Sequence, residues 1–129
     1  MLLQDKVVII TGIGPGMGRK LAIEAAKVGA KLVLGARSTD FVYSVAAEIG
    51  DQALAVTADV SNQEDCDRLA AAAIERFGRI DGLVNSAYGS APFIPFEDGD
   101  LNDWRRRCWS DFLRASRIYD MPTFPLARA

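Results

Sequence analysis

The sequence predicts an α/β domain built on a parallel sheet, and three observations lead to this fold class. Short apolar segments of strand length alternate with longer segments whose apolar residues recur every three or four positions. The strand segments are continuous apolar runs, which is typical of strands buried on both faces of a parallel sheet. A glycine-rich turn at residues 11–18 lies between the first strand segment and the first helical one.

Four strands and three helices are expected in chain order, and a further helix is expected to begin near Leu101 with Asp100 as its cap. The strands are predicted at residues 6–10, 31–36, 53–57 and 82–85. The first helix is expected over residues 19–28, ending at Gly29. The second is expected from a cap at Ser38 or Thr39 to Gly50, and the third from a capping box over residues 61–64 to Gly78.

Each predicted helix has one apolar stripe that is expected to pack on the sheet. In the first helix the stripe contains Leu21, Ala22, Ala25 and Val28. In the third helix Cys66 belongs to a stripe with offsets of three and four, so it is predicted to be a core residue. Right-handed crossovers between successive strands are expected for this arrangement.

Composition narrows the class of protein. A chain of 129 residues that is half apolar and one quarter charged is expected to form one small soluble domain. It contains no apolar run of the roughly 18 residues that a membrane span needs, and no signal peptide pattern at its N-terminus, so a cytoplasmic location is predicted. The absence of histidine excludes Ser-His-Asp triads, and no metal site is predicted.

The turn Thr11-Gly12-Ile13-Gly14-Pro15-Gly16-Met17-Gly18 carries the functional signal. It does not match G-x-G-x-x-G or the P-loop pattern, but it matches T-G-x-x-x-G-x-G. A strand, a glycine turn and a helix in this order place the unpaired N–H groups of a helix N-terminus where a phosphate can bind. Glycine allows positive φ and close approach of a pyrophosphate to the backbone.

With this turn, and with Asp59-Val60 and Asn85-Ser86-Ala87 further along in order, the chain resembles the short-chain dehydrogenase/reductase family over residues 4–104. The resemblance implies a Rossmann-like doubly wound sheet, here ending after about four strands in the order 3-2-1-4. It also implies dinucleotide binding and NAD(P)-dependent carbonyl or alcohol chemistry. Residues 1–104 are therefore expected to form the cofactor-binding half of such a domain.

The resemblance also implies the residues that contact the cofactor. Asp59 is expected to bond the adenine with Val60 packed nearby, and Asn85 to tie the central strands together near the cofactor ribose. Ser86 stands where the family usually has a second asparagine, followed by Ala87. In the turn, the expected contacts are Thr11, Gly12, Gly14, Gly16, Met17 and Gly18.

The choice between the two nicotinamide cofactors is expected at the end of the second strand. Arg37 and Ser38 stand where NAD-binding relatives place a carboxylate, and a guanidinium suits the 2′-phosphate of NADP(H). NADP(H) is therefore favoured, although Asp40 lies close enough in sequence to serve the ribose of NAD(H).

No catalytic residue is assigned. The family uses a Tyr-x-x-x-Lys pair as general acid or base and its charge partner. Here Ala47, Pro92 and Thr123 stand four residues after the three tyrosines, and the last lysine is Lys31. The chain is therefore expected either to be the cofactor-binding part of an oxidoreductase or to be a non-catalytic module that binds a dinucleotide or a partner. A carbonyl or alcohol substrate is expected only in a full-length relative.

The segment 105–129 differs from the rest of the chain. It carries six arginines and two aspartates, against 9 basic and 15 acidic side chains before it. A shifted reading frame and a rewritten end of a shortened paralogue both explain this change, and both stay open. The basic segment has no nucleic-acid or membrane pattern, so neither partner is expected. An oligomer through the free edge of the fourth strand is expected instead.

Overall fold

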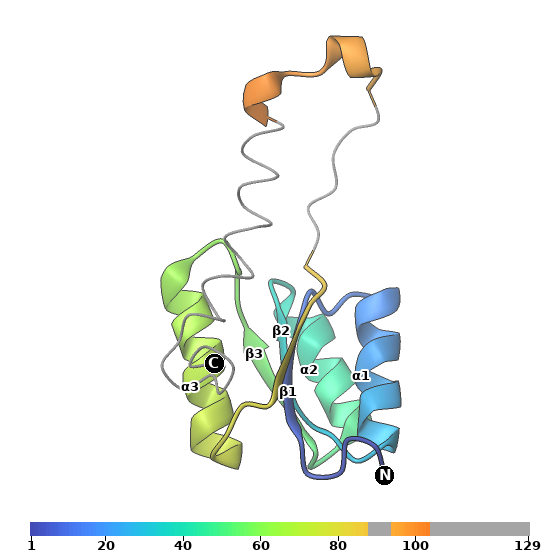
Figure 1. The fold of residues 1–129 in the computed structure, drawn as a ribbon, viewed down its shortest axis with the longest axis vertical. Coiled ribbons are helices and arrows are strands. Elements are labelled where there is room, and N and C mark those ends of the chain that lie inside the picture. The colour runs from blue at the N-terminus through green and yellow to red at the C-terminus, as the bar shows by residue number, and fades with distance from the viewer. Residues whose placement is uncertain (88–93, 104–129) are drawn as a thin grey trace.

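Residues 1–87 and 94–103 are described by the computed structural model, and they contain a four-stranded parallel sheet in the order β3-β2-β1-β4 (Figure 1). This is the predicted strand order. The elements are β1 (Val7–Thr11), α1 (Met17–Lys27), β2 (Lys31–Ala36), α2 (Thr39–Ile49), β3 (Ala53–Thr57), α3 (Gln63–Phe77), β4 (Gly82–Asn85) and the 3₁₀ helix η1 (Phe96–Asp98).

The central strand β1 pairs with a neighbour on each side. Ile9 is in register with Val33 of β2 and with Leu83 of β4. All five residues of β1 are buried, because helices cover both faces of the sheet. Burial on both faces of the sheet therefore explains the continuous apolar run in the sequence, as predicted.

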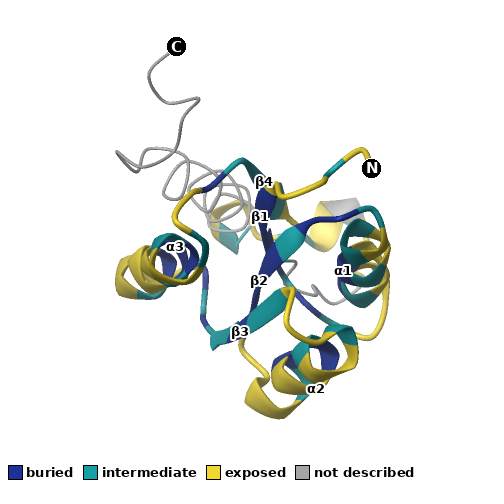
Figure 2. Cartoon of the chain, turned by 90° about the horizontal axis from the view of Figure 1, so that it is seen from below, coloured by how far each residue is buried: buried dark blue, intermediate teal, exposed yellow. Residues whose placement is uncertain are grey.

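Two hydrophobic clusters form the core, one on each face of the sheet. Val7 and Ile9 point towards α3, whereas Val8 and Ile10 point towards α1 and α2. This alternation follows from the two-residue period of a strand. Figure 2 shows α3 alone on one face and the other two helices together on the opposite face. The sheet is therefore doubly covered, as in a Rossmann-like fold.

Local boundaries differ from the predictions at the first strand and first helix. β1 extends to Thr11, which pairs with Gly35 and Asn85 instead of beginning the turn. α1 begins at Met17, after the N-cap residue Gly16, whose carbonyl accepts from the Lys20 N–H at 3.5 Å. The prediction that Leu21 belongs to the core was wrong, because it is 38% exposed at one side of the buried Ala22.

The predicted capping box at the start of α3 was also wrong. The N-cap is Asn62, whose Oδ1 accepts from the Glu64 N–H at 2.9 Å. Ser61 instead donates its hydroxyl to Asp59 Oδ1 at 2.7 Å. The end of α3 is as predicted, since Gly78 has φ +78° and its N–H bonds to the Ile74 carbonyl.

Cys66 is fully buried, as predicted, and its thiol donates to the Val60 carbonyl at 3.4 Å. No helix among the described residues is long and apolar enough to cross a membrane. In the loop after β4, the Asn102 N–H donates to Asp100 Oδ1 at 2.8 Å, which supports the predicted cap at Asp100. Predictions for residues 88–93 and for the segment 105–129 lie outside the described residues.

Candidate dinucleotide-binding site

A cavity of about 460 Å³ opens at the carboxyl ends of the four strands. Ligands of doubly wound sheets bind at this edge, near the point where the strand order reverses. Here the reversal lies between β1 and β4. The lining residues follow each strand in turn: Gly12, Ile13, Gly14, Ala36, Arg37, Ser38, Ala58, Asp59, Val60, Ser61, Ser86 and Ala87.

The turn after β1 requires glycine at its first position. Gly12 has φ +75°, and a Cβ on it would lie 2.3 Å from the backbone nitrogen of Ala87. The turn is held to β2 by N–H groups of Gly12 and Ile13, which both donate to the Gly35 carbonyl. The absence of a side chain at Gly12 therefore lets the ends of β1 and β4 form one continuous wall.

The start of α1 is arranged to leave room for a ligand. A Cβ on Gly18 would lie 2.4 Å from the Gly12 carbonyl oxygen, so the helix packs directly on the turn. By contrast, a Cβ on Gly14 or Gly16 would meet no atom within 4 Å. Among the described residues, no protein group accepts a hydrogen bond from the N–H of Met17 or Gly18. These groups suit an anion at the helix N-terminus.

Thr11 and Asn85 join the central strands beneath the cavity instead of lining it. The fully buried Thr11 donates its hydroxyl to Asn85 Oδ1 at 3.0 Å and to the Val84 carbonyl at 3.4 Å. The two residues are register partners on β1 and β4. The predicted tie between the central strands is thus present, and the cavity wall begins with the next residues, Ser86 and Ala87.

The end of β2 presents a cationic side chain to the cavity. Arg37 is exposed, and among the described residues it makes no ion pair or hydrogen bond. Ser38 is the N-cap of α2, but its hydroxyl makes no capping bond. Asp40 lies in the first turn of the same helix. An unpaired guanidinium beside a helix N-terminus favours a bound anion.

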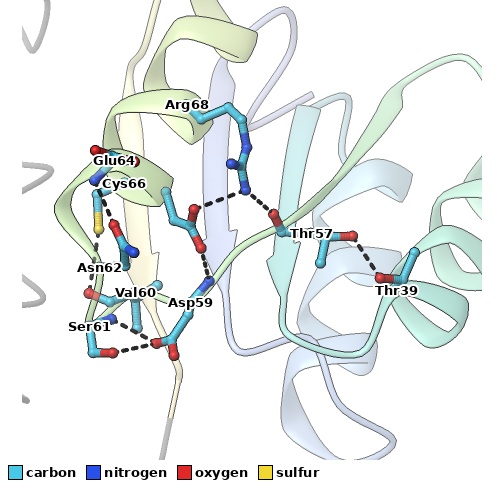
Figure 3. Close-up of polar contacts among 10 residues, drawn as sticks. Thr39, Thr57, Asp59, Val60, Ser61, Asn62, Glu64, Cys66 and Arg68 are labelled. Carbon is cyan, nitrogen blue, oxygen red and sulfur yellow. Dashed lines mark hydrogen bonds and ion pairs between the residues drawn. The ribbon is translucent and has the colours of Figure 1, made fainter.

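The end of β3 is held by several polar contacts (Figure 3). Asp59 Oδ1 accepts from both the N–H and the hydroxyl of Ser61, at 2.9 and 2.7 Å. The Asn62 N–H donates to the Asp59 carbonyl at 2.9 Å. Val60 is buried behind this turn. Asp59 is thus both a turn residue and part of the cavity wall.

Besides Thr11 and Asn85, three more of the expected contacts lie outside the cavity lining. Gly16 and Met17 border a neighbouring depression of about 340 Å³ with Lys20, Leu21 and Glu24, and Gly18 packs on the turn. Conversely, Ile13, Ala36, Ala58 and Ser61 line the cavity although the sequence analysis did not single them out. Each of these four is adjacent in sequence to a predicted contact, and that adjacency is the feature of the sequence that could have identified them. The described residues contain no group of three His, Cys, Asp or Glu side chains able to hold a metal ion.

Comparison with known families agrees with this architecture. The model of the short chain dehydrogenase family matches residues 6–109. The chain belongs to this family. The match includes all four strands and the three longer helices, so the expected family and the Rossmann-like fold are confirmed.

Individual relatives are dehydrogenases and reductases. The chain is 45% identical to the L-rhamnose 1-dehydrogenase (NAD(P)(+)) of Azotobacter vinelandii over 105 residues, which cover 76% of this chain and 41% of the relative. It is 39% identical to the 7alpha-hydroxysteroid dehydrogenase of Escherichia coli K12 over 107 residues, covering 81% and 41%. This member of the short chain dehydrogenase family thus spans about two fifths of the length of these relatives.

Solved structures of the family include complexes with both nicotinamide cofactors. A 3-ketoacyl-(acyl-carrier-protein) reductase from Brucella melitensis, complexed with NADH, superimposes with a TM-score of 0.84 and 36% identity, covering 94% of this chain and 51% of that one. A metagenomic short-chain oxidoreductase in complex with NADP gives a TM-score of 0.80 and 25% identity, covering 98% and 58%. Relatives of this chain therefore bind NAD(P), with examples of each form.

Proposed function

We propose that this chain binds NADP(H) in the cavity at the carboxyl ends of its strands, as the cofactor-binding part of a carbonyl or alcohol oxidoreductase. The observation that carries the proposal is the turn at Gly12, which packs against the backbone of Ala87 and borders a 460 Å³ cavity. The cofactor accepts or supplies the hydride in this class of reaction. The chain's own residues bind and orient it.

The chemistry along the cavity fits the parts of a dinucleotide. The N-terminus of α1, with Gly14 and Gly16 open beside it, suits the pyrophosphate. At the end of β3, Asp59 and the buried Val60 offer a hydrogen-bond acceptor beside an apolar surface, which suits adenine. Ser86 and Ala87 border the same cavity, beside the strand that holds Asn85, and suit the ribose next to nicotinamide.

NADP(H) is proposed as the preferred form because of Arg37. Its exposed guanidinium borders the cavity, where a 2′-phosphate would receive charge-assisted bonds. Ser38, with its hydroxyl unused by the helix cap, adds a donor at the same place. The same proposal includes weaker binding of NAD(H), in which Asp40 would contact the ribose.

We propose that the 129 residues alone do not catalyse hydride transfer. The sequence has no lysine four residues after a tyrosine, so the family's proton-transfer pair is not formed within this chain. A general acid or base of this kind typically contributes about 10²- to 10⁴-fold to the rate. Non-catalytic binding of a dinucleotide or a partner subunit is therefore the second candidate, and a small-molecule substrate belongs to full-length relatives. A cytoplasmic location is part of the same proposal.

Calorimetric titration with NADPH and NADH tests the proposal. Arg37→Ala should weaken NADPH binding about tenfold or more, about 1.4 kcal/mol, and leave NADH binding nearly unchanged. Arg76→Ala is the matched control, because Arg76 is an exposed arginine near the far end of α3. Equal losses for both cofactors would show that Arg37 does not contact the 2′-phosphate. No binding of either cofactor by the folded chain would refute the proposed function.

Turnover is measured separately with a panel of carbonyl and alcohol compounds and both cofactors. No reaction above background is expected from the purified chain. A reaction abolished by changing Tyr43, Tyr88 or Tyr119 would contradict the proposed lack of catalysis and leave the binding proposal intact.

A further inference from the structure

The backbone at the end of β3 leaves the sheet at Ala58, the first residue of this strand end that lines the cavity. The last bond to the sheet runs from the Ala58 N–H to the Ala36 carbonyl, at 2.9 Å. The next N–H, that of Asp59, donates instead to Asp65 Oδ2 at 2.7 Å. Since Asp65 lies in the first turn of α3, the helix and not the sheet holds the position of Asp59.

Arg68 extends this contact to the strand. Its Nη2 donates to the Thr57 carbonyl at 2.5 Å (Figure 3). The same nitrogen pairs with Asp65 Oδ1 at 3.1 Å. β3 is the edge strand of the described sheet, so its outer carbonyls have no neighbouring strand. The Asp65–Arg68 pair therefore holds the chain on both sides of Ala58, at the Thr57 carbonyl and at the Asp59 N–H.

Neither Asp65 nor Arg68 lines the cavity, whereas the strand end that they hold does. Ala58, Asp59 and Val60 all border the 460 Å³ space. A carboxylate that accepts a backbone N–H and also pairs with a guanidinium has both oxygens engaged, so its rotamer is well defined. A shift in the Asp65–Arg68 pair would consequently move the cavity wall without removing any group that touches the ligand.

We propose that Asp65 and Arg68 are positioning residues that set the Asp59 carboxylate for recognition of the adenine amino group. The inference rests on the proposed binding of a dinucleotide in this cavity. A carboxylate only accepts hydrogen bonds, so it favours the 6-amino group of adenine over the 6-oxo group of hypoxanthine. The selectivity between these two bases therefore reports the position of Asp59, whereas thermal stability reports only folding.

The experiment compares binding of NADPH with binding of its hypoxanthine analogue to the full chain. Wild type should bind NADPH more tightly. Asp65→Ala should weaken NADPH about three- to tenfold, the effect of one typical hydrogen bond, and change binding of the analogue less than about twofold. Asp65→Asn keeps an acceptor for the Asp59 N–H, so it should restore most of the selectivity. Arg68→Gln should lose part of it.

Asp67→Ala is the matched control. Asp67 lies on the exposed side of α3, where its carboxylate accepts from Gln63 Nε2 at 2.8 Å, and it makes no contact with the end of β3. It should bind both dinucleotides like the wild type. Thermal melts give the melting temperature of every variant, and binding is measured well below that temperature. If Asp65→Ala does not fold, Asp65→Asn and Arg68→Gln carry the comparison.

The outcomes separate the two proposals. If wild type binds NADPH but selectivity is unchanged in the Asp65 and Arg68 variants, the positioning role is wrong and the proposed function stands. Equal binding of both dinucleotides by wild type would likewise overturn the positioning role. If wild type binds neither dinucleotide, the proposed function fails and the inference fails with it. A fall in melting temperature without a change in selectivity would indicate a merely structural pair.

Discussion

Substitution of Gly12 by alanine should destabilise the whole domain, because two costs combine at this position. The residue has φ +75°, which costs an L-residue with a side chain about 1–2 kcal/mol. The new Cβ would also lie 2.3 Å from Ala87 N and 2.4 Å from Ser86 C. Separating β1 from β4 to ordinary contact requires a shift of about 1 Å in a close-packed interior.

The sum gives the expected size of the effect. Overpacking of this kind costs about 1–3 kcal/mol, so the total loss in free energy of unfolding is about 2–5 kcal/mol. A domain of this size has only about 5–15 kcal/mol of stability. Urea unfolding followed by circular dichroism at 25 °C measures the loss as a lower midpoint at an unchanged slope.

Gly14→Ala is the matched control in the same turn. It lacks positive φ, and its Cβ would meet no atom within 4 Å, so its free energy of unfolding should stay within about 1 kcal/mol of wild type. Equal midpoints for Gly12→Ala and wild type would refute the close approach of the turn to β4. A large loss in Gly14→Ala would refute the assignment of open space beside that residue.

Three further predictions concern binding, pH and association. Gly16→Val should fold normally, since no atom lies within 4 Å of the added Cβ. Its affinity for NADPH, measured by calorimetry, should fall at least tenfold, about 1.4 kcal/mol. Unchanged affinity would show that Gly16 is not part of the site. Partial burial opposes ionisation of Asp81, but bonds from the Arg79 side chain and the Val7 N–H outweigh it and hold the pKa of Asp81 below its ordinary value of 3.8. The stabilisation is present above pH 3.8 and is lost as the pH falls through the lowered pKa. Asp81→Asn should therefore lower the free energy of unfolding, measured with urea, by about 1 kcal/mol at pH 7 and by progressively less below pH 3.8. A difference between the two proteins that is constant at all pH values would contradict this. Within the described residues β4 pairs only with β1, so we expect concentration-dependent association through its other edge in sedimentation runs, and a compact monomer at every concentration would contradict it.

Much of the fold follows from local patterns in the sequence. The predicted bounds of β2, β3 and β4 agree with the structure, because each apolar run is bounded by turn residues or glycine. The spacing of the glycines located the turn at the edge where the cavity opens. These features depend on a few neighbouring residues, so no knowledge of distant contacts was needed to predict them.

Local patterns failed where two neighbouring residues compete for one role. Ser61 and Asn62 are both good N-caps. Asn62 takes the cap because the Ser61 hydroxyl donates to Asp59 instead. In the same way, helical periodicity placed Leu21 on the buried face, but the orientation of α1 on the sheet leaves it 38% exposed. A hydrogen bond between near neighbours decided the first case, and the packing of α1 on the sheet decided the second.

The sequence by itself determined the alternation of strands and helices, the glycine turn and the cation after β2, since each is set by composition and spacing. Only the tertiary structure brought Asp81 to the N–H of Val7, 74 residues away, and Asp65 to the N–H of Asp59. It also showed that Thr11 and Asn85 lie beneath the cavity while Ser86 and Ala87 border it. Polar contacts of this kind depend on where packing of the core places each strand end, and no periodicity in the sequence records that position.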